Sequence, residues 1–181
     1  MRFAELGYIS NLLSLSRVFL VIPLYFCLKL ESESANYWAF FVMVLIAATD
    51  VFDGRLARKL KQQSDLGRIL DPLADKVGVA ITCVLLVKLR DLPLWYLIVI
   101  LSRDIAILIL ALFWIAKTKV VVESRLIGKA TVLAIGIVLI VFTLQLESVK
   151  WPFLWLSLML VVISSIDYFW QFIRLYGDEN S

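Results

Sequence analysis

Long apolar runs, broken by short polar segments, follow one another along the whole chain. Set against the charged residues and prolines that interrupt them, these runs predict six helices. The predicted spans are 12–30, 37–52, 70–87, 92–116, 127–146 and 152–175. Each is close to the roughly 20 residues that a helix needs to cross the hydrocarbon of a bilayer. The pattern predicts an all-α integral membrane protein with six transmembrane helices, and residues 1–10 favour a short interfacial helix before them.

Composition narrows the classes of protein that this chain can be. Of its 181 residues 62% are hydrophobic and 18% are charged, whereas soluble domains have roughly 45–50% and about 25%. Six helices leave only about 60 residues for all loops, so we expect one transmembrane domain over 1–181. The chain has no histidine, which excludes the commonest general base and the usual zinc ligand. Cys27 and Cys83 lack the spacing of a zinc or disulfide site.

Charge is informative through its distribution, since the net charge of +3 is too small to indicate a nucleic-acid partner. If the N-terminus is cytoplasmic, the basic residues that fall outside are Lys29, Lys88, Arg90 and Lys150. Arg17, Lys76 and Arg103 lie well inside predicted helices, and the remainder of the 18 basic residues lie on the cytoplasmic side. Positive residues favour the cytoplasmic side. We therefore predict that both termini are cytoplasmic.

Two aspartates with unusual neighbours lie at the end of the second predicted span. At 100° per residue, Asp50 and Asp53 share a helix face with Gly54, Ala57 and Arg58. Acids next to a membrane helix are costly and mark function by default. Taken singly, each acid could instead be a helix cap or an ion-pair partner, and the small residues could serve close helix packing.

A second pair of aspartates begins the third span. Gly67, Asp71 and Asp75 follow at i, i+4 and i+8, so they form one stripe if the segment is helical throughout. Pro72 leaves two alternatives open, because it could be the first helical residue after an Asp71 cap or a tolerated kink.

The four acids together indicate a metal site. Carboxylate oxygens suit Mg²⁺, Mn²⁺ or Ca²⁺ better than zinc or copper, and two such ions about 4 Å apart can clamp an in-line displacement at phosphorus. Glycine and alanine beside the acids let a ligand approach closely. Arg58 suits a pair of phosphate oxygens. The pattern predicts a diphosphate site with metals at the cytoplasmic interface.

These residues resemble a known family. The run D-x-x-D-G-x-x-A-R, eight residues, then G-x-x-x-D-x-x-x-D is the signature of the CDP-alcohol phosphatidyltransferases, and residues 50–75 match every signature position. The length, the six spans, Asn11 to Arg17, Asp71 to Lys76 and Ser102-Arg-Asp104 are similar as well. The flanking features look most like the bacterial phosphatidylglycerophosphate synthases and the related cardiolipin synthases.

The resemblance implies that an acceptor hydroxyl attacks the lipid-linked phosphorus of CDP-diacylglycerol and that CMP leaves. It implies that Asp50, Asp53, Asp71 and Asp75 hold the metal, two ions of Mg²⁺ or Mn²⁺, with Asp75 also the catalytic base. The CDP-binding residues would be Asp50, Asp53, Gly54, Ala57, Arg58 and Gly67. It further implies a homodimer in a bacterial inner membrane with a cytoplasmic active site.

The acceptor is a phosphorylated alcohol such as glycerol 3-phosphate under the main hypothesis. Its phosphate needs cations, for which Lys129, Arg125 and Arg103 are the candidates, although the residues after the fourth span could only set topology. Many phosphatidylglycerophosphate synthases continue with G-K-x-K-T-x-x-Q, whereas this chain has Gly128-Lys-Ala-Thr131, without the second lysine and the glutamine, so the acceptor stays open. Arg103 and its neighbour Asp104 project about 100° apart, so we expect separate partners for them.

Two alternatives remain. Within the family, the acceptor could be phosphatidylglycerol, giving cardiolipin, or another alcohol. In a different class, the same acids could form a relay in a cation or proton-coupled transporter. The clustering of the acids at one end of the helices, and the absence of an internal repeat, disfavour the transporter.

Overall fold

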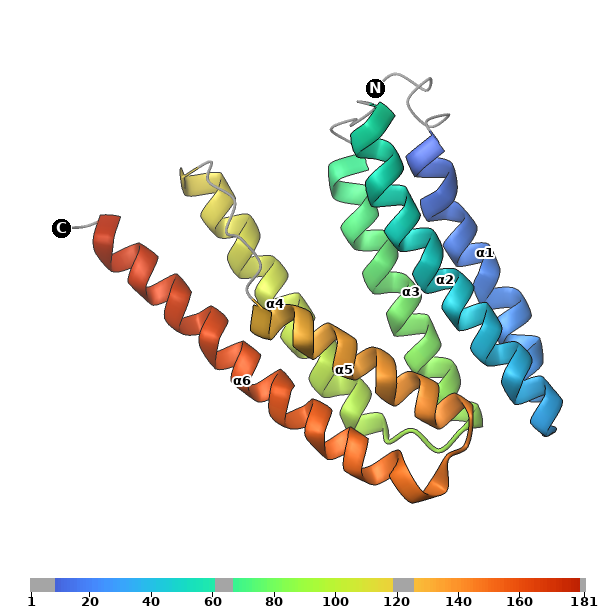
Figure 1. The fold of residues 1–181 in the computed structure, drawn as a ribbon. Coiled ribbons are helices and arrows are strands. Elements are labelled where there is room, and N and C mark those ends of the chain that lie inside the picture. The colour runs from blue at the N-terminus through green and yellow to red at the C-terminus, as the bar shows by residue number, and fades with distance from the viewer. Residues whose placement is uncertain (1–8, 61–66, 119–125, 180–181) are drawn as a thin grey trace. The chain divides into compact units, whose positions relative to one another are not determined.

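The computed structural model describes residues 9–60, 67–118 and 126–179, with side chains in 19–49, 76–110 and 126–173. All secondary structure within these ranges is helical. The helices are α1 (Ile9–Lys29), α2 (Glu33–Leu60), α3 (Gly67–Leu89), α4 (Leu94–Thr118), α5 (Leu126–Thr143) and α6 (Glu147–Glu179) (Figure 1). Each contains most of one predicted span, so the six predicted helices are confirmed. The expected interfacial helix falls mainly on residues 1–8, outside the described residues.

Two helix boundaries differ from the prediction by five residues or more. Helix α2 continues to Leu60 rather than ending at residue 52, and α6 begins at Glu147 with Pro152 inside it. The predicted spans end where charged residues begin. A helix can continue past such residues, because its backbone hydrogen bonds do not depend on apolar side chains. Pro152 is the sixth residue of α6, in its second turn, so it removes one intrahelical hydrogen bond, as helices in membranes tolerate.

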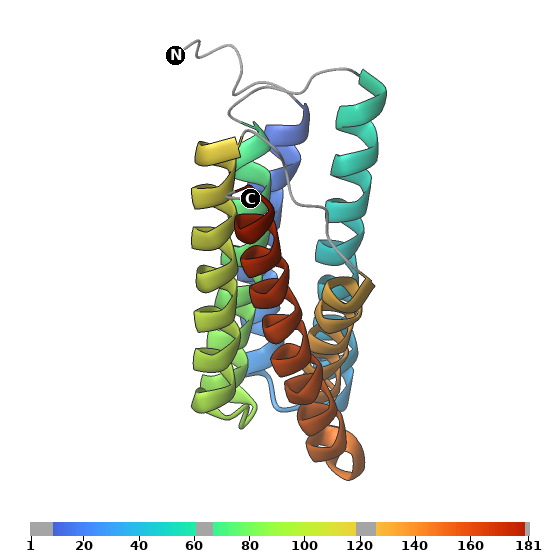
Figure 2. The ribbon, with the colours of Figure 1, turned by 90° about the vertical axis from the view of Figure 1, so that its left-hand side faces the viewer.

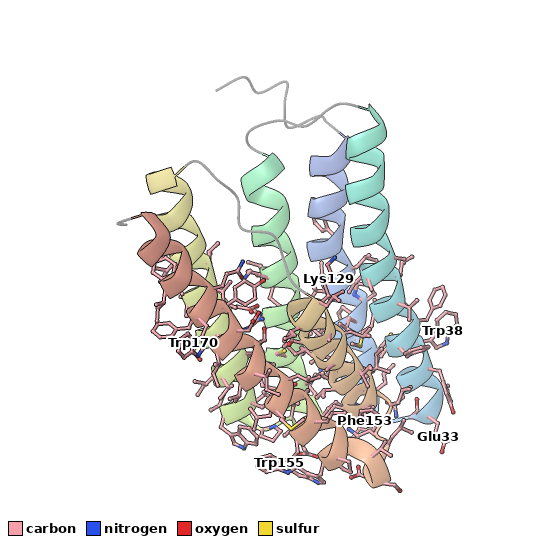
Figure 3. The ribbon with its side chains drawn as sticks, turned by 60° about the vertical axis from the view of Figure 1, so that its left-hand side comes forward. Glu33, Trp38, Lys129, Phe153, Trp155 and Trp170 are labelled. Carbon is pink, nitrogen blue, oxygen red and sulfur yellow. The ribbon has the colours of Figure 1, made fainter. Side chains whose placement is uncertain are left out.

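The surfaces of the last two helices are strongly apolar. Within the part of the chain that is described, Leu126–Thr143 and Glu147–Ile173 are long and apolar enough to cross a membrane, with mean hydropathies of 2.3 and 1.8. Trp38, Trp95, Trp151 and Trp155, near the starts of α2, α4 and α6, are exposed, and Figure 3 shows Trp38 and Trp155 projecting away from their helices. Lipid-facing helices have this character, since indoles favour the headgroup region.

The chain forms two compact units, the first of which is Met1–Leu92 with Phe142–Gln145. In it, α1 packs against both α2 and α3 (Figure 1). Leu24 and Leu28 of α1, Ala39 of α2 and Leu86 of α3 are buried. In both Figure 1 and Figure 2 the C-terminal end of α2 and the N-terminal end of α3 lie at the same end of this unit.

The opposite end of this unit is held by Arg90, which follows α3. Its side chain is buried, and Nη2 donates to Asn36 Oδ1 at 2.6 Å and to the Leu30 carbonyl at 3.4 Å. Ser32 caps α2, since its Oγ accepts the Ala35 N–H at 3.2 Å. Arg90 therefore links the end of α3 to the turn between α1 and α2.

The second unit is Pro93–Val141 with Leu146–Ser181. Its helices α4 and α6 run in the same direction and are joined by a buried hydrogen bond of 2.6 Å between Tyr96 Oη and Ser157 Oγ. Helix α5 runs against α6, and the Thr131 hydroxyl donates to the Leu160 carbonyl at 3.2 Å. Polar side chains thus connect three apolar helices, a common means of helix association in membranes.

Candidate functional site

The four signature aspartates lie on two helices of the first unit. Asp50 and Asp53 belong to the C-terminal part of α2, and Asp71 and Asp75 to the first turns of α3. These helix ends lie at the same end of the unit (Figure 2). The side chains of the aspartates, and of Gly54, Ala57, Arg58 and Gly67, are outside the described residues. The backbone nevertheless places both acidic segments in helices, as the sequence predicts.

The structure decides between the two alternatives for Pro72. Helix α3 starts at Gly67 and is continuous through Asp71, Pro72 and Asp75. Asp71 is therefore not the residue that precedes the helix. Because the segment is helical throughout, the spacing of four residues places Gly67, Asp71 and Asp75 on one helical stripe.

Two described residues next to these segments, Thr49 and Gly78, have a hydroxyl group or no side chain. Thr49, before Asp50, donates its hydroxyl to the Ile46 carbonyl at 2.7 Å. Three residues after Asp75, a Cβ added at the buried Gly78 would meet none of the described residues within 4 Å. Helix α3 thus has room at its side close to the acidic segment.

Outside these segments, the described side chains include no group of three or more Cys, Asp or Glu residues that could hold a metal. The sequence also contains no histidine. The signature segments offer four carboxylates, and oxygen ligands of this kind suit Mg²⁺ or Mn²⁺.

A second polar cluster surrounds Arg103 in the middle of α4. Nη1 donates to Asp104 Oδ1 at 2.8 Å and Nη2 donates to Ser164 Oγ of α6 at 2.7 Å. The guanidinium carbon lies 5.8 Å from the ring centroid of Tyr168. The Arg103 side chain is only 10% exposed, and its Nε is buried without a hydrogen-bond partner in the described part of the chain.

The contact between Arg103 and Asp104 corrects a prediction. The 100° between neighbouring residues led us to expect separate partners, and that expectation was wrong for this pair. A long arginine side chain can bend back along the helix, which the direction of its Cα–Cβ bond does not reveal. Arg103 also has the expected partner on another helix, namely Ser164.

The other two predicted acceptor residues lie around the start of α5. Lys129 is exposed in the first turn of this helix (Figure 3), whereas Arg125 lies outside the described residues. Gly128 is buried against α6, and a Cβ added there would lie 3.3 Å from Tyr168 Oη. Tyr168 therefore contacts Arg103 and also lies beside the turn that carries Lys129.

Ser164 and Tyr168 are not among the site residues predicted from the sequence, although the sequence carries a signal for them. Tyr96 and Arg103 are seven residues apart on α4, and their partners Ser157 and Ser164 are seven apart on α6. Polar residues with this period in apolar helices indicate a shared seam between parallel helices. The same period on α6 leads to Gln171, whose Oε1 is buried and lacks a partner among the described residues.

Comparison with known proteins supports the signature. The family model for CDP-alcohol phosphatidyltransferases matches residues 7–163, which include all four aspartates, Arg103 and Lys129. The CDP-diacylglycerol–glycerol-3-phosphate 3-phosphatidyltransferase of Bacillus subtilis is 34% identical over 89% of this chain and 93% of its own length. The Aquifex aeolicus protein of the same name is 37% identical over 88% of this chain and 93% of its own.

A third relative carries a different name. The cardiolipin synthase (CMP-forming) of Streptomyces coelicolor is 39% identical to this chain, but over 56% of this chain and 49% of its own length. The relatives thus agree in the family and differ in the acceptor that their names imply. The extent of the family match, together with the two nearly full-length relatives, places the chain in the CDP-alcohol phosphatidyltransferase family.

Proposed function

We propose that this protein transfers the phosphatidyl group of CDP-diacylglycerol to glycerol 3-phosphate, forming phosphatidylglycerophosphate and releasing CMP. The observation that carries the proposal is the combination of the uninterrupted signature at residues 50–75 with the nearly full-length similarity to two relatives named for this reaction. The similarity to a cardiolipin synthase covers little more than half of the chain, so phosphatidylglycerol is the second candidate acceptor.

The donor half of the reaction is assigned to α2 and α3. Asp50, Asp53, Asp71 and Asp75 would hold two divalent cations, Mg²⁺ or Mn²⁺, which would neutralise the diphosphate and stabilise the departing CMP. The continuous helices through both acidic segments and the room beside Gly78 support this assignment.

The remaining signature residues bind the CDP group. Gly54, Ala57 and Gly67 leave space beside the backbone for the nucleotide, because they have at most a methyl side chain. Arg58 donates to phosphate oxygens. A lipid diphosphate needs its headgroup in water and its acyl chains in hydrocarbon, which fits a site at the ends of apolar helices.

Asp75 acts as the base for the acceptor. Its carboxylate accepts the proton of the acceptor hydroxyl as the oxygen attacks the lipid-linked phosphorus, and the bond from that phosphorus to the CMP oxygen breaks. Positioning and charge neutralisation supply most of the acceleration in such phosphoryl chemistry.

The acceptor phosphate is assigned to the basic residues of the second unit. Arg103, Lys129 and Arg125 supply positive charge, and Arg103 is supported by its low exposure and its unpaired buried Nε. A buried donor without a partner is costly, so an anionic ligand that accepts from this N–H would stabilise it.

The protein acts in the inner membrane of a bacterium, with both termini and the active site on the cytoplasmic side, and as a homodimer. Six helices cross the membrane under this proposal. The apolar surfaces of α5 and α6 and the excess of basic residues on one side support the location.

A CMP-release assay on purified protein tests the function. We expect CMP from CDP-diacylglycerol with glycerol 3-phosphate in Mg²⁺ or Mn²⁺, little with phosphatidylglycerol, inositol phosphate or serine, and none in EDTA until metal is restored. Turnover with phosphatidylglycerol alone would identify a cardiolipin synthase, and full turnover without metal would refute the role of the aspartates. Cation flux into liposomes without CMP would favour a transporter.

A further inference from the structure

Tyr168 of α6 connects two elements of the second unit that each carry a basic residue. Its ring lies 5.8 Å from the guanidinium carbon of Arg103 on α4. Its hydroxyl lies so near the backbone of Gly128 on α5 that an added Cβ would be 3.3 Å away, and Cε2 would be 3.4 Å away. Lys129 is the next residue along α5. The Tyr168 side chain therefore contacts Arg103 itself and the residue that precedes Lys129.

The guanidinium of Arg103 is held on several sides. Ser164 accepts from Nη2 at 2.7 Å, and Asp104 accepts from Nη1 at 2.8 Å. Ser164 lies four residues before Tyr168, so the hydroxyl and the ring belong to the same face of α6. An arginine offers five N–H donors, of which these two bonds use two. Nε is buried with no partner in the part of the chain described here.

At the start of α5, the residue that faces the Tyr168 hydroxyl is Gly128, which has no side chain. Gly128 is buried, and only a residue without Cβ lets the Tyr168 hydroxyl lie this close without displacement. The contact sets how far the first turn of α5, with Lys129, stands from α6. A phosphate bound by two cations needs both at fixed places, because ordering flexible side chains on binding lowers affinity.

We infer that Tyr168 is a positioning residue of the acceptor site. Its ring face holds the Arg103 guanidinium, and its hydroxyl sets the place of the first turn of α5 against α6. The inference rests on the proposed function, since it assigns Arg103 and Lys129 to the acceptor phosphate. Tyr168 itself acts through these residues and determines affinity for the acceptor rather than for the lipid donor.

The test compares Tyr168→Leu with Phe169→Leu, which removes an exposed aromatic ring from the next position of the same helix. For Tyr168→Leu we expect the KM for glycerol 3-phosphate to rise about tenfold through loss of the cation–π contact. The KM for CDP-diacylglycerol should stay within about twofold, and Phe169→Leu should change neither value. An equal rise in both KM values, or none in folded Tyr168→Leu, would overturn the inference.

A second pair of variants decides the matter if Tyr168→Leu does not fold. Gly128→Ala places a methyl group against the Tyr168 hydroxyl and should raise the KM for glycerol 3-phosphate about threefold, as a slight displacement of two cations predicts. Tyr168→Phe keeps the ring over Arg103 and removes the hydroxyl, so adding it to Gly128→Ala should restore most of the affinity. Failure of this rescue would refute the role of the contact. A wild-type protein that releases no CMP would instead refute the proposed function.

Discussion

Single side chains in this protein take roles that their sequence neighbours do not reveal. Arg103 and Asp104 were expected to have separate partners, yet they bond to each other while Arg103 also reaches Ser164. Of the four basic residues predicted on the outer side of the membrane, Arg90 and Lys150 are buried, with 6% and 4% exposure, whereas Lys29 and Lys88 are exposed. Lys150 is bonded to Glu147, and Arg90 to Asn36. Their charged groups form contacts within and between helices. A count of basic residues along the sequence does not separate such residues from those that face water.

At this scale the sharpest prediction concerns Asp75. Asp75→Asn keeps the size of the side chain and removes its ability to accept a proton, so we expect CMP release to fall at least about 10²-fold, as loss of a general base does. The variant should remain folded, as judged by its helical circular dichroism and its elution as a single species in detergent.

Asp91→Asn is the matched control for this change. Asp91 follows α3 at its other end, with φ of 57°, a backbone conformation that asparagine also tolerates. We expect wild-type turnover from it. Wild-type turnover from Asp75→Asn would remove Asp75 from the mechanism, and equal losses in both variants would point to a general effect of charge.

At the scale of elements, the helices extend beyond the apolar runs that predict them. Helix α2 reaches Leu60 and includes the signature residues from Asp50 to Arg58. The first half of the signature therefore lies on one continuous helix, which begins among apolar residues. Both acidic segments share one end of the first unit, while Arg90 ties α3 to the α1–α2 turn at the other end.

Arg90→Leu should destabilise this unit. The change removes the donor to Asn36 and leaves a part-buried amide unpaired, so the free energy of unfolding should fall by about 1–3 kcal/mol. Thermal unfolding of the purified protein in detergent measures the effect.

Lys88→Leu removes an exposed positive charge from the last turn of α3 and is the control. We expect almost no loss of stability from it. Asn36→Leu should add little to the loss in the Arg90→Leu background, because the bond is already gone. Independent, additive losses from the two substitutions would contradict the link.

The whole molecule consists of two compact units, one with the aspartate segments and one with the Arg103 and Tyr168 cluster. Exposed apolar side chains run along α6 in both its halves, for example Met159, Ile166 and Trp170. Figure 3 shows Trp170 directed away from the helix. A surface of this kind requires a lipid environment or other apolar cover.

Orientation is a prediction for the whole molecule. In a background without Cys27 and Cys83, Glu31→Cys places a thiol in the exposed α1–α2 turn, and Ser181→Cys places one at the last residue. A membrane-impermeant maleimide should label Glu31→Cys in intact spheroplasts and Ser181→Cys only after permeabilisation, because the basic residues favour cytoplasmic termini. The reverse pattern would invert the topology and place the aspartates outside.

From the sequence alone came the prediction of an all-helical chain, with the six helices that the described residues form, and the choice of the four aspartates that we propose hold the metal. These features depend on local information, namely the length of apolar runs and the spacing of acids along one helix. Only the tertiary structure decided that Pro72 lies within α3, that Arg90 is a buried link and that Tyr168 joins Arg103 to the start of α5. Such contacts join residues as many as 65 positions apart, as from Arg103 to Tyr168. They depend on which helix faces pack together, and the pattern along one chain leaves that choice open because apolar faces fit many partners.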